Sequence, residues 1–324
     1  MPIALSACPA CNTELTQCRT LFECVSFNRI TPVLRCDCGL TFKQLIPDAL
    51  ELRAHYQAHY YTHDGAAFDV NDATARAERA SAGHRLSQIS AFMQRDPASI
   101  RGLDYGCGNG SFVAHARHFR FDMQGMDPFL PPQPVIADLL HADLDTLEAN
   151  QFDLITMINV AEHLSDARAT FKRLQYALRP GGALFLSCPW GDSFAATQFG
   201  PRWGHLDLDE HLLFWTPRSL DDMCRALGFA GPSKYWIGGS PFPLGRVPLK
   251  SVTQAIPESP SHALGMATPS TMALPHRPSL KQSLQSTIGA LGRRVQANPL
   301  ASTVVRQLMH HGRTGDYLAY VIRA

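Results

Sequence analysis

The sequence lacks any apolar run that approaches the roughly 20 residues of a membrane-spanning helix, so no membrane span is predicted. Its N-terminal residues lack both a basic region and a long apolar core, and therefore do not resemble an export signal. Charged residues are few, at 18% against 45% hydrophobic residues, a balance typical of a soluble globular protein. These absences predict a cytoplasmic protein, and 324 residues can hold one large domain with a small appendage.

Charge of one sign is also not in strong excess, since the net charge is only +1, but the charge is unevenly distributed. Residues 240–324 contain nine Lys and Arg against two acidic residues, so the remainder of the chain carries a net negative charge. An anionic partner would explain this basic segment. A solvated helical face explains it more simply.

A short strand, a glycine turn and the start of a helix are predicted over residues 100–112. Gly106, Gly108 and Gly110 let the backbone turn sharply and let a ligand approach main-chain N–H groups. A dinucleotide fingerprint needs a third glycine where Ser111 stands, which argues against NAD. Asp104, at the end of the strand, instead suits the ammonium and sulfonium charges of S-adenosylmethionine (SAM).

Residues 104–110 resemble the first motif of the class I SAM-dependent methyltransferases. Asp127 ends a second predicted strand 23 residues after Asp104, and its carboxylate can accept both ribose hydroxyls. The run Leu-Arg-Pro-Gly-Gly at residues 178–182 resembles another family signature, in which proline stops a helix and glycines turn the chain. The run Asn-Val-Ala-Glu-His at residues 159–163 resembles the fourth motif, as in the ubiquinone-biosynthesis O-methyltransferases.

The resemblance implies further cofactor-binding residues. Asn159 is delivered to the edge of the cofactor, and Asp143 matches the position that meets the adenine amino group, with Asp138 as a competitor. Tyr61 belongs to a Tyr-Tyr pair that in the family helps to close the cofactor pocket, although packing between two parts of the chain explains it equally well. Four prolines in residues 128–134 predict a shortened or absent crossover helix.

Cysteine is concentrated near the start of the chain, where six of the nine fall within the first 38 residues. Cys8, Cys11, Cys36 and Cys38 form two close pairs, and four thiolates suit a closed tetrahedral Zn²⁺ site. The pattern resembles the zinc-ribbon-like segment that precedes many bacterial methyltransferases of this class. The second pair has one intervening residue where the family has two, so Cys18 or Cys24 are alternative ligands. Buried thiols without metal are the alternative to a zinc site.

Three histidines are candidates for removing a proton from a methyl acceptor: His163, His205 and His211. His163 follows the apolar run 152–158, and capping or packing are its alternative roles. His205 and His211 lie in the aromatic-rich segment 189–216, which in the family borders the methyl-transfer cavity. His211 also matches a family histidine, and a structural hydrogen bond near the helix start at Thr216 explains it equally well.

The predicted fold is α/β, with a doubly wound, seven-stranded, mostly parallel sheet of the Rossmann-like methyltransferase type and a small N-terminal zinc knuckle. We expect a zinc-ribbon-like segment at 1–48, docking helices at 49–98, the SAM-binding core at 99–239, a loop and helical insertion at 240–312 and a closing strand at 313–324. The closing strand alternates polar and apolar residues and resembles the seventh strand of the family, antiparallel to the fifth.

These residues together predict an enzyme that binds SAM and Zn²⁺ and methylates a small molecule, with a hydroxyl of a sugar, phenol or natural product as the leading acceptor. Carbon or nitrogen methylation, including that of an RNA base, is the second interpretation. RNA as a partner is disfavoured because residues 1–50 balance four basic with four acidic side chains. A SAM-binding module without turnover is the third. The oligomeric state is not predicted.

Overall fold

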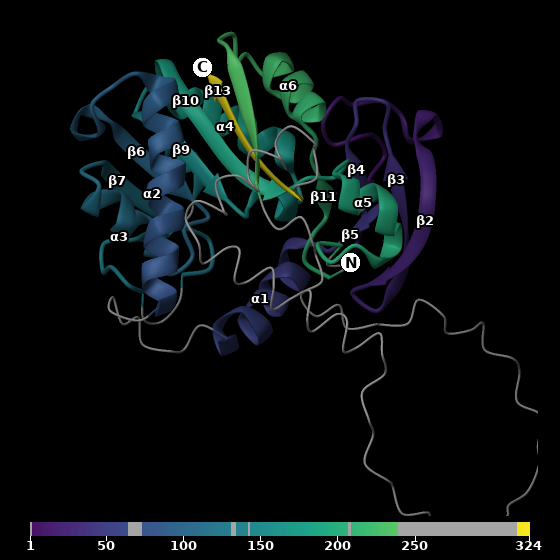
Figure 1. Ribbon diagram of the computed structural model, residues 1–324. Helices are drawn as coiled ribbons and strands as arrows, with labels where there is room; N and C mark the ends of the chain where they lie inside the picture. Colours follow the sequence, from purple (N-terminus) through teal and green to yellow (C-terminus); the bar gives the residue numbers. More distant parts are fainter. Residues whose placement is uncertain (1, 64–72, 131–133, 142, 207–208, 239–315) are drawn as a thin grey trace, which may run out of the picture.

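A central sheet of seven strands organises the chain in the computed structural model, which describes residues 2–63, 73–130, 134–141, 143–206, 209–238 and 316–324 (Figure 1). Its strand order is β12-β13-β10-β9-β6-β7-β8. The five strands from β10 to β8 pair in parallel, and β13 runs antiparallel between β10 and β12. The strands are β6 (Arg101–Tyr105), β7 (Asp122–Asp127), β8 (Leu140–His141), β9 (Phe152–Ile158), β10 (Leu178–Pro189), β12 (Ser233–Gly238) and β13 (Tyr317–Arg323).

Helices cover both faces of this sheet. On one face, α2 (Ala73–Met93) and α3 (Ser111–His118) bury Leu86, Ile89 and Val113 against Leu154 and Phe185 of the strands. On the other face, α4 (Ala167–Ala177) and α6 (Pro217–Ala226) bury a second cluster that includes Phe171, Leu174, Leu220 and Met223. The apolar residues alternate along the strands to feed both clusters, which is the pattern of a doubly wound sheet. The predicted fold class is confirmed.

Local sequence explains where these elements begin and end. Thr216 caps α6 by accepting a hydrogen bond from the Ser219 N–H, with Pro217 at the first helical position. Asp166 caps α4 in the same way through the Ala169 N–H. In the described residues between β7 and β8 the chain forms no helix, as the prolines predict.

The N-terminal residues form small sheets of their own. The strands β2 (Arg19–Ser26), β3 (Arg29–Arg35) and β4 (Thr41–Lys43) are antiparallel, and β1 (Ile3–Ala4) pairs with β5 (Leu45–Ile46). The strand β11 (Leu213–Phe214) comes from the core region of the chain but pairs with β4, so one sheet contains both parts. Figure 1 shows the N-terminal strands β2 and β3 in purple, away from α2 and α3, with α1 (Ala49–His63) below the core.

The remaining elements are short. They are α5 (Phe194–Phe199) and the single-turn 3-10 helices η1 (Leu15–Gln17), η2 (Pro97–Ser99), η3 (Leu144–Thr146), η4 (Ala161–His163) and η5 (Gly200–Arg202). The antiparallel position of β13 is the one predicted for the closing strand. The predicted insertion at 240–312 lies outside the described residues, and the domain boundaries stay predictions. Within the described residues, no helix combines the length and apolarity needed to cross a membrane.

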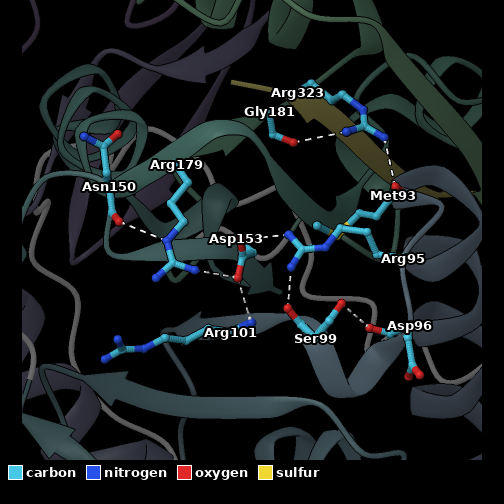
Figure 2. A network of polar contacts seen from close by, with 10 residues as sticks. All are labelled: Met93, Arg95, Asp96, Ser99, Arg101, Asn150, Asp153, Arg179, Gly181 and Arg323. Carbon is cyan, nitrogen blue, oxygen red and sulfur yellow. Dashed lines mark hydrogen bonds and ion pairs between the residues drawn. The ribbon is translucent and has the colours of Figure 1, made fainter.

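A polar network at the start of β9 joins this strand to its neighbours β6 and β10 and to the segment after α2 (Figure 2). The side chain of Asp153, 5% exposed, accepts hydrogen bonds from Arg95 Nη1 at 2.7 Å, from Arg179 Nη1 at 2.9 Å and from the Arg101 N–H at 3.0 Å. Burial raises the pKa of this carboxyl, but the three donors outweigh burial and hold the pKa below its ordinary value. The charged form of Asp153 therefore stabilises the fold.

We expect Asp153→Asn to lower the free energy of unfolding by about 1–3 kcal/mol at pH 7, because it removes charge-assisted hydrogen bonds. The lowered pKa means that the contribution is present above the unfolded pKa of about 3.9 and is lost as the pH falls through the folded pKa. Urea denaturation at pH 7 and at a series of pH values below about 3.9 measures both effects. Asp122→Asn, at an exposed position of β7, is the control, and an equal loss in both variants would contradict the assignment.

Candidate functional site

A pocket of about 480 Å³ opens at the carboxyl ends of β6, β7 and β9, the edge at which parallel α/β sheets bind ligands. Its lining combines strand ends with the segments that follow them and with α1: Ala49, Leu52, Tyr56, Tyr105, Gly106, Asp127, Pro128, Phe129, Ile158, Asn159, Val160, His163, Leu164, Ser165, Asp166, Thr170 and Glu210. Four of the predicted site residues, Gly106, Asp127, Asn159 and His163, thus lie around one pocket, and their roles stay predictions.

The glycine turn has the backbone conformation that its sequence requires. Gly106, Gly108 and Gly110 have φ angles of +78°, +54° and +85°, all in the left-handed region. A Cβ on Gly106 would lie 2.4 Å from Val160 Cγ2, so this glycine also allows the segment after β9 to approach. The turn is therefore shaped by both backbone conformation and packing.

Asp127 at the end of β7 holds this turn in place. The side chain is 8% exposed, its Oδ2 accepts the Gly108 N–H at 2.8 Å, and its Oδ1 accepts the Phe129 N–H at 2.7 Å. Each oxygen of an ionised carboxylate can accept more than one hydrogen bond. Asp127 lines the pocket in the orientation that these two bonds impose.

Asp104, the other predicted carboxylate, lies deeper, with 2% exposure. Burial raises its pKa to about 7, and Asp127 adds to the rise, whereas the Thr156 hydroxyl that donates to Oδ1 at 2.6 Å and Arg85 oppose it. Arg85 lies on α2. Burial lowers the pKa of its guanidinium, whereas the nearby Tyr317 and Asp104 oppose this lowering. The sequence analysis missed Arg85 because nothing in the helical pattern of α2 distinguishes it.

The helix α1 supplies an aromatic wall. Tyr56 stacks on Phe129, with ring centroids 5.1 Å apart and an interplanar angle of 24°, and both line the pocket. Tyr61, which the resemblance selected, lies in the same helix, but its side chain is outside the described residues. Asp143 is exposed and caps η3 by accepting the Asp145 N–H at 3.0 Å, and it is not among the pocket-lining residues. Its contact with adenine stays a prediction, as does that of Asp138, which pairs with Arg117.

The three candidate histidines lie in one chain of contacts. The rings of His163 and His211 are 4.8 Å apart at 70°, and His211 Nδ1 is 2.7 Å from the carbonyl oxygen of His205. Only His163 lines the pocket; its Nδ1 is 3.0 Å from the carbonyl oxygen of Glu210. His205 Nε2 is 3.0 Å from the carboxylate of Asp316. Of the three histidines, His163 is therefore the one placed to contact a ligand in this pocket.

Glu162 directly precedes His163 in η4, and its side chain is 0% exposed. Neither of its carboxylate oxygens has a hydrogen-bond partner, and burial raises its pKa to about 8. A buried carboxyl without a donor is costly and uncommon in folded proteins. The resemblance of residues 159–163 to the fourth motif of the family gave no sign that Glu162 would be buried.

The aromatic-rich segment 189–216 was expected to border the methyl-transfer cavity, but most of its described aromatic residues lie elsewhere. Glu210 is its one described residue in the lining of the pocket, whereas Trp190 and Trp215 are buried in the core. Trp203 and Phe214 line a second pocket of about 430 Å³ against Arg19 and Arg35 of the N-terminal sheet. The segment therefore joins the two sheets as well as bordering the site.

The four predicted cysteines converge. One ligand atom of each of Cys8, Cys11, Cys36 and Cys38 lies within 4.8 Å of the others. The sulfurs of Cys8 and Cys38 are 3.7 Å apart and those of Cys11 and Cys36 are 3.4 Å apart. A tetrahedral Zn²⁺ with Zn–S bonds of about 2.3 Å places sulfurs about 3.8 Å apart, so this donor set fits the ion. Cys24 lies on β2 and is not part of the group.

We expect Gly106→Ala to destabilise the protein more than Gly181→Ala. The two glycines have nearly the same φ, +78° and +77°, but a Cβ at position 181 has nothing within 4 Å, whereas one at position 106 meets Val160. Gly181→Ala should cost about 1–2 kcal/mol of backbone strain, and Gly106→Ala that cost plus the collision. In urea denaturation, adding Val160→Ala should recover part of the excess. Equal losses at both glycines would show that the approach of Val160 is unimportant.

Comparison with known proteins adds the family. A family model described as a methyltransferase domain matches residues 74–233. A ubiquinone biosynthesis O-methyltransferase of Xanthomonas axonopodis pv. citri is 31% identical over 118 residues, which cover 32% of this chain and 48% of that protein. The chain thus spans about half the length of the curated relatives that it matches.

The similarity to solved structures is low, both in sequence identity and in TM-score. A SAM-dependent methyltransferase from Archaeoglobus fulgidus is 14% identical, with 78% of this chain and 100% of that chain covered and a TM-score of 0.43. The 1,6-didemethyltoxoflavin-N1-methyltransferase of Burkholderia thailandensis is 18% identical, with 66% and 92% covered and a TM-score of 0.44. The methyltransferase-domain match, the strand order of the central sheet and the glycine turn before α3 agree, so residues 74–233 form a methyltransferase domain with the features of the class I SAM-dependent type.

Proposed function

We propose that this protein transfers the methyl group of SAM to a small-molecule acceptor, with a hydroxyl as the leading acceptor group. The observation that carries the proposal is the pair of buried carboxylates, Asp104 and Asp127, on either side of a left-handed glycine turn at the open edge of the sheet. This edge also carries the pocket, so a ligand that enters meets both the turn and Asp127. The match of residues 74–233 to a methyltransferase domain supports SAM as that ligand.

The residues around the pocket fit the chemical groups of SAM. Asp127 would accept the ribose hydroxyls with the same carboxylate oxygens that the Gly108 and Phe129 N–H groups orient toward the turn. Asp104 would face the cationic methionine part, where a nearby ammonium would favour its charged form. Arg85, which lies near enough to Asp104 for the two charges to interact, would be a candidate partner for the methionine carboxylate. Tyr56 and Phe129 would enclose the bound molecule from the side of α1.

When bound, SAM supplies an electrophilic methyl group, and the protein must align the acceptor with it and exclude competing water. His163 reaches the pocket wall beside Val160 and Leu164. Because its Nδ1 lies at the Glu210 carbonyl, the neutral ring carries its proton there, and Nε2 has the basic lone pair. His163 is therefore the histidine best placed to influence an acceptor proton. His205 and His211 would act through it or by shaping the surrounding loop.

A hydroxyl acceptor is favoured because the curated relatives are named ubiquinone biosynthesis O-methyltransferases. The acceptor of this chain is a finer question, since the match covers about half of those proteins. Methylation of carbon or nitrogen is the alternative, and it would need no residue to take up a hydroxyl proton. A panel of phenols, sugars and amines with labelled SAM would separate these cases.

We further propose that the N-terminal knuckle binds one Zn²⁺ through Cys8, Cys11, Cys36 and Cys38, and that this ion is structural. Four protein ligands would leave no open position for chemistry. The knuckle packs on the core through Arg168 of α4, which donates to the carbonyl oxygen of Ala10 at 2.6 Å, and through Gly39, which lies against Thr216. The zinc would then stabilise the part of the knuckle that contacts α4 and the start of α6.

Calorimetry with S-adenosylhomocysteine tests the cofactor assignment. Asp127→Asn should weaken binding by about 1–3 kcal/mol, or roughly 5- to 150-fold, because it removes charged acceptors for the ribose. Asp122→Asn on the same strand is exposed and should bind like the wild type. Thermal unfolding of both variants checks that the Asp127 turn still forms. Failure of the wild type to bind would leave only a different ligand for this pocket, and unchanged affinity in Asp127→Asn would refute the ribose contact.

Metal analysis of the purified protein should give one zinc per chain. Cys36→Ser should reduce the zinc content and lower the thermal midpoint, whereas Cys224→Ser, at a buried cysteine of α6, should keep the zinc. Loss of stability without loss of zinc in Cys36→Ser would exclude this ligand. Absence of zinc from the wild type would identify the group as reduced, buried thiols.

A further inference from the structure

The side chains of Glu162, His163 and His211 form a second cluster of potential metal ligands, apart from the cysteines. One ligand atom of each of the three lies within 4.8 Å of the other two. Glu162 and His163 belong to η4, and His211 lies on the segment just before β11, so the cluster joins two regions far apart in the sequence. We propose that these three residues bind one divalent transition-metal ion at the wall of the cofactor pocket.

The buried carboxylate of Glu162 is the first argument. It is 0% exposed, both of its oxygens lack a hydrogen-bond donor, and none of the ion pairs between described residues includes it. An ionised carboxylate in such a place costs several kcal/mol unless a cation compensates it. A metal ion held between Glu162 and the two imidazoles would satisfy these oxygens and remove the cost.

The orientation of the two histidines is the second argument. The Nδ1 atoms of His163 and His211 lie 3.0 Å and 2.7 Å from backbone carbonyl oxygens, those of Glu210 and His205. A carbonyl only accepts, so each neutral ring carries its proton on Nδ1 and a lone pair on Nε2. Metal-binding histidines are usually fixed by such a hydrogen bond from the nitrogen that does not bind the ion. Both rings therefore have the tautomer of a metal ligand.

The backbone around the cluster is the third argument, because a metal site needs ligands whose positions are fixed in advance. The Leu212 N–H donates to the carbonyl oxygen of Glu162 at 2.8 Å. Trp215 Nε1 donates to the carbonyl oxygen of Ala161 at 2.8 Å. The segment that carries His211 is thus fastened directly to the turn that carries the other two ligands.

The donor set indicates the kind of ion. Two imidazoles and one carboxylate suit divalent manganese, iron, cobalt or zinc, and three protein ligands leave positions open for water or substrate. Thiolates, in contrast, suit softer ions such as zinc, so the cysteine knuckle and this cluster should take up Mn²⁺ very differently.

The consequence for catalysis rests on the proposed function. His163 lines the pocket, so an acceptor hydroxyl could occupy an open position of the ion, which would lower the pKa of the hydroxyl. The proton would leave to solvent, the oxygen would bond to the methyl carbon, and the carbon–sulfur bond would break with its electron pair on sulfur. His163 and His211 would then be ligands, and not proton acceptors.

Binding of Mn²⁺ to the full-length protein that carries one zinc per chain, with the zinc of the cysteine knuckle only, is followed by electron paramagnetic resonance and tests the site without SAM or acceptor. The wild type and His118→Gln, a control at an exposed histidine of α3, should each bind one Mn²⁺ per chain. Glu162→Gln keeps the shape of the side chain but removes its charge, and should weaken binding at least tenfold. His211→Gln should do the same and serves as the second variant if Glu162→Gln does not fold.

Absence of stoichiometric Mn²⁺ binding in the wild type, or equal affinity in both ligand variants and the control, would overturn the proposal. Methyl transfer is measured separately, with and without Mn²⁺. Mn²⁺ binding without any SAM binding would retain this site and refute the proposed function. SAM binding with no Mn²⁺ binding would do the reverse.

Discussion

The pairing of β11 with β4 is the contact on which the arrangement of the site depends. It places a strand from the core region of the chain in the N-terminal sheet, and the Lys43 N–H extends it by donating to the Leu212 carbonyl at 3.0 Å. On its other side the same short segment bonds to η4 through Leu212 and Trp215. Only one residue, Leu212, separates His211 from β11, so the position of His211 next to His163 follows from these hydrogen bonds.

Three acidic side chains are buried within the same region, and the chain stabilises them to different degrees. Asp127 receives two backbone N–H groups, Asp104 receives the Thr156 hydroxyl and lies near Arg85, and Glu162 receives no donor. The pKa values reflect this, with burial raising that of Asp104 to about 7 and that of Glu162 to about 8. Residues kept at such a cost are expected where a ligand supplies the missing interaction, since apolar side chains would otherwise stabilise the fold better.

The features predicted correctly from sequence are those with a local physical cause. The left-handed glycines, the carboxylates at neighbouring strand ends, the proline-rich segment without a helix and the cap at Thr216 each depend on a few consecutive residues. The features that were missed depend on long-range packing. Tyr56 and Arg85 occupy unremarkable helical positions, and the meeting of Glu162 with His211 requires β11 to join the N-terminal sheet. No pattern of hydrophobic periodicity encodes that a two-residue strand will leave its own domain.

The N-terminal knuckle and the pocket are therefore mechanically linked. Gly39, with φ +96°, follows the second cysteine pair and packs its backbone on Thr216, while β4 begins two residues later and pairs with β11. A rigid knuckle would hold β4, and through it the segment with His211, on the His163 side of the pocket and not on the side of the glycine turn. The N-terminal segment would then position the acceptor side of the site and leave the cofactor side to the central sheet. Such a positioning role would account for the cysteine cluster without a nucleic-acid partner, and residues 1–50 carry four basic and four acidic side chains.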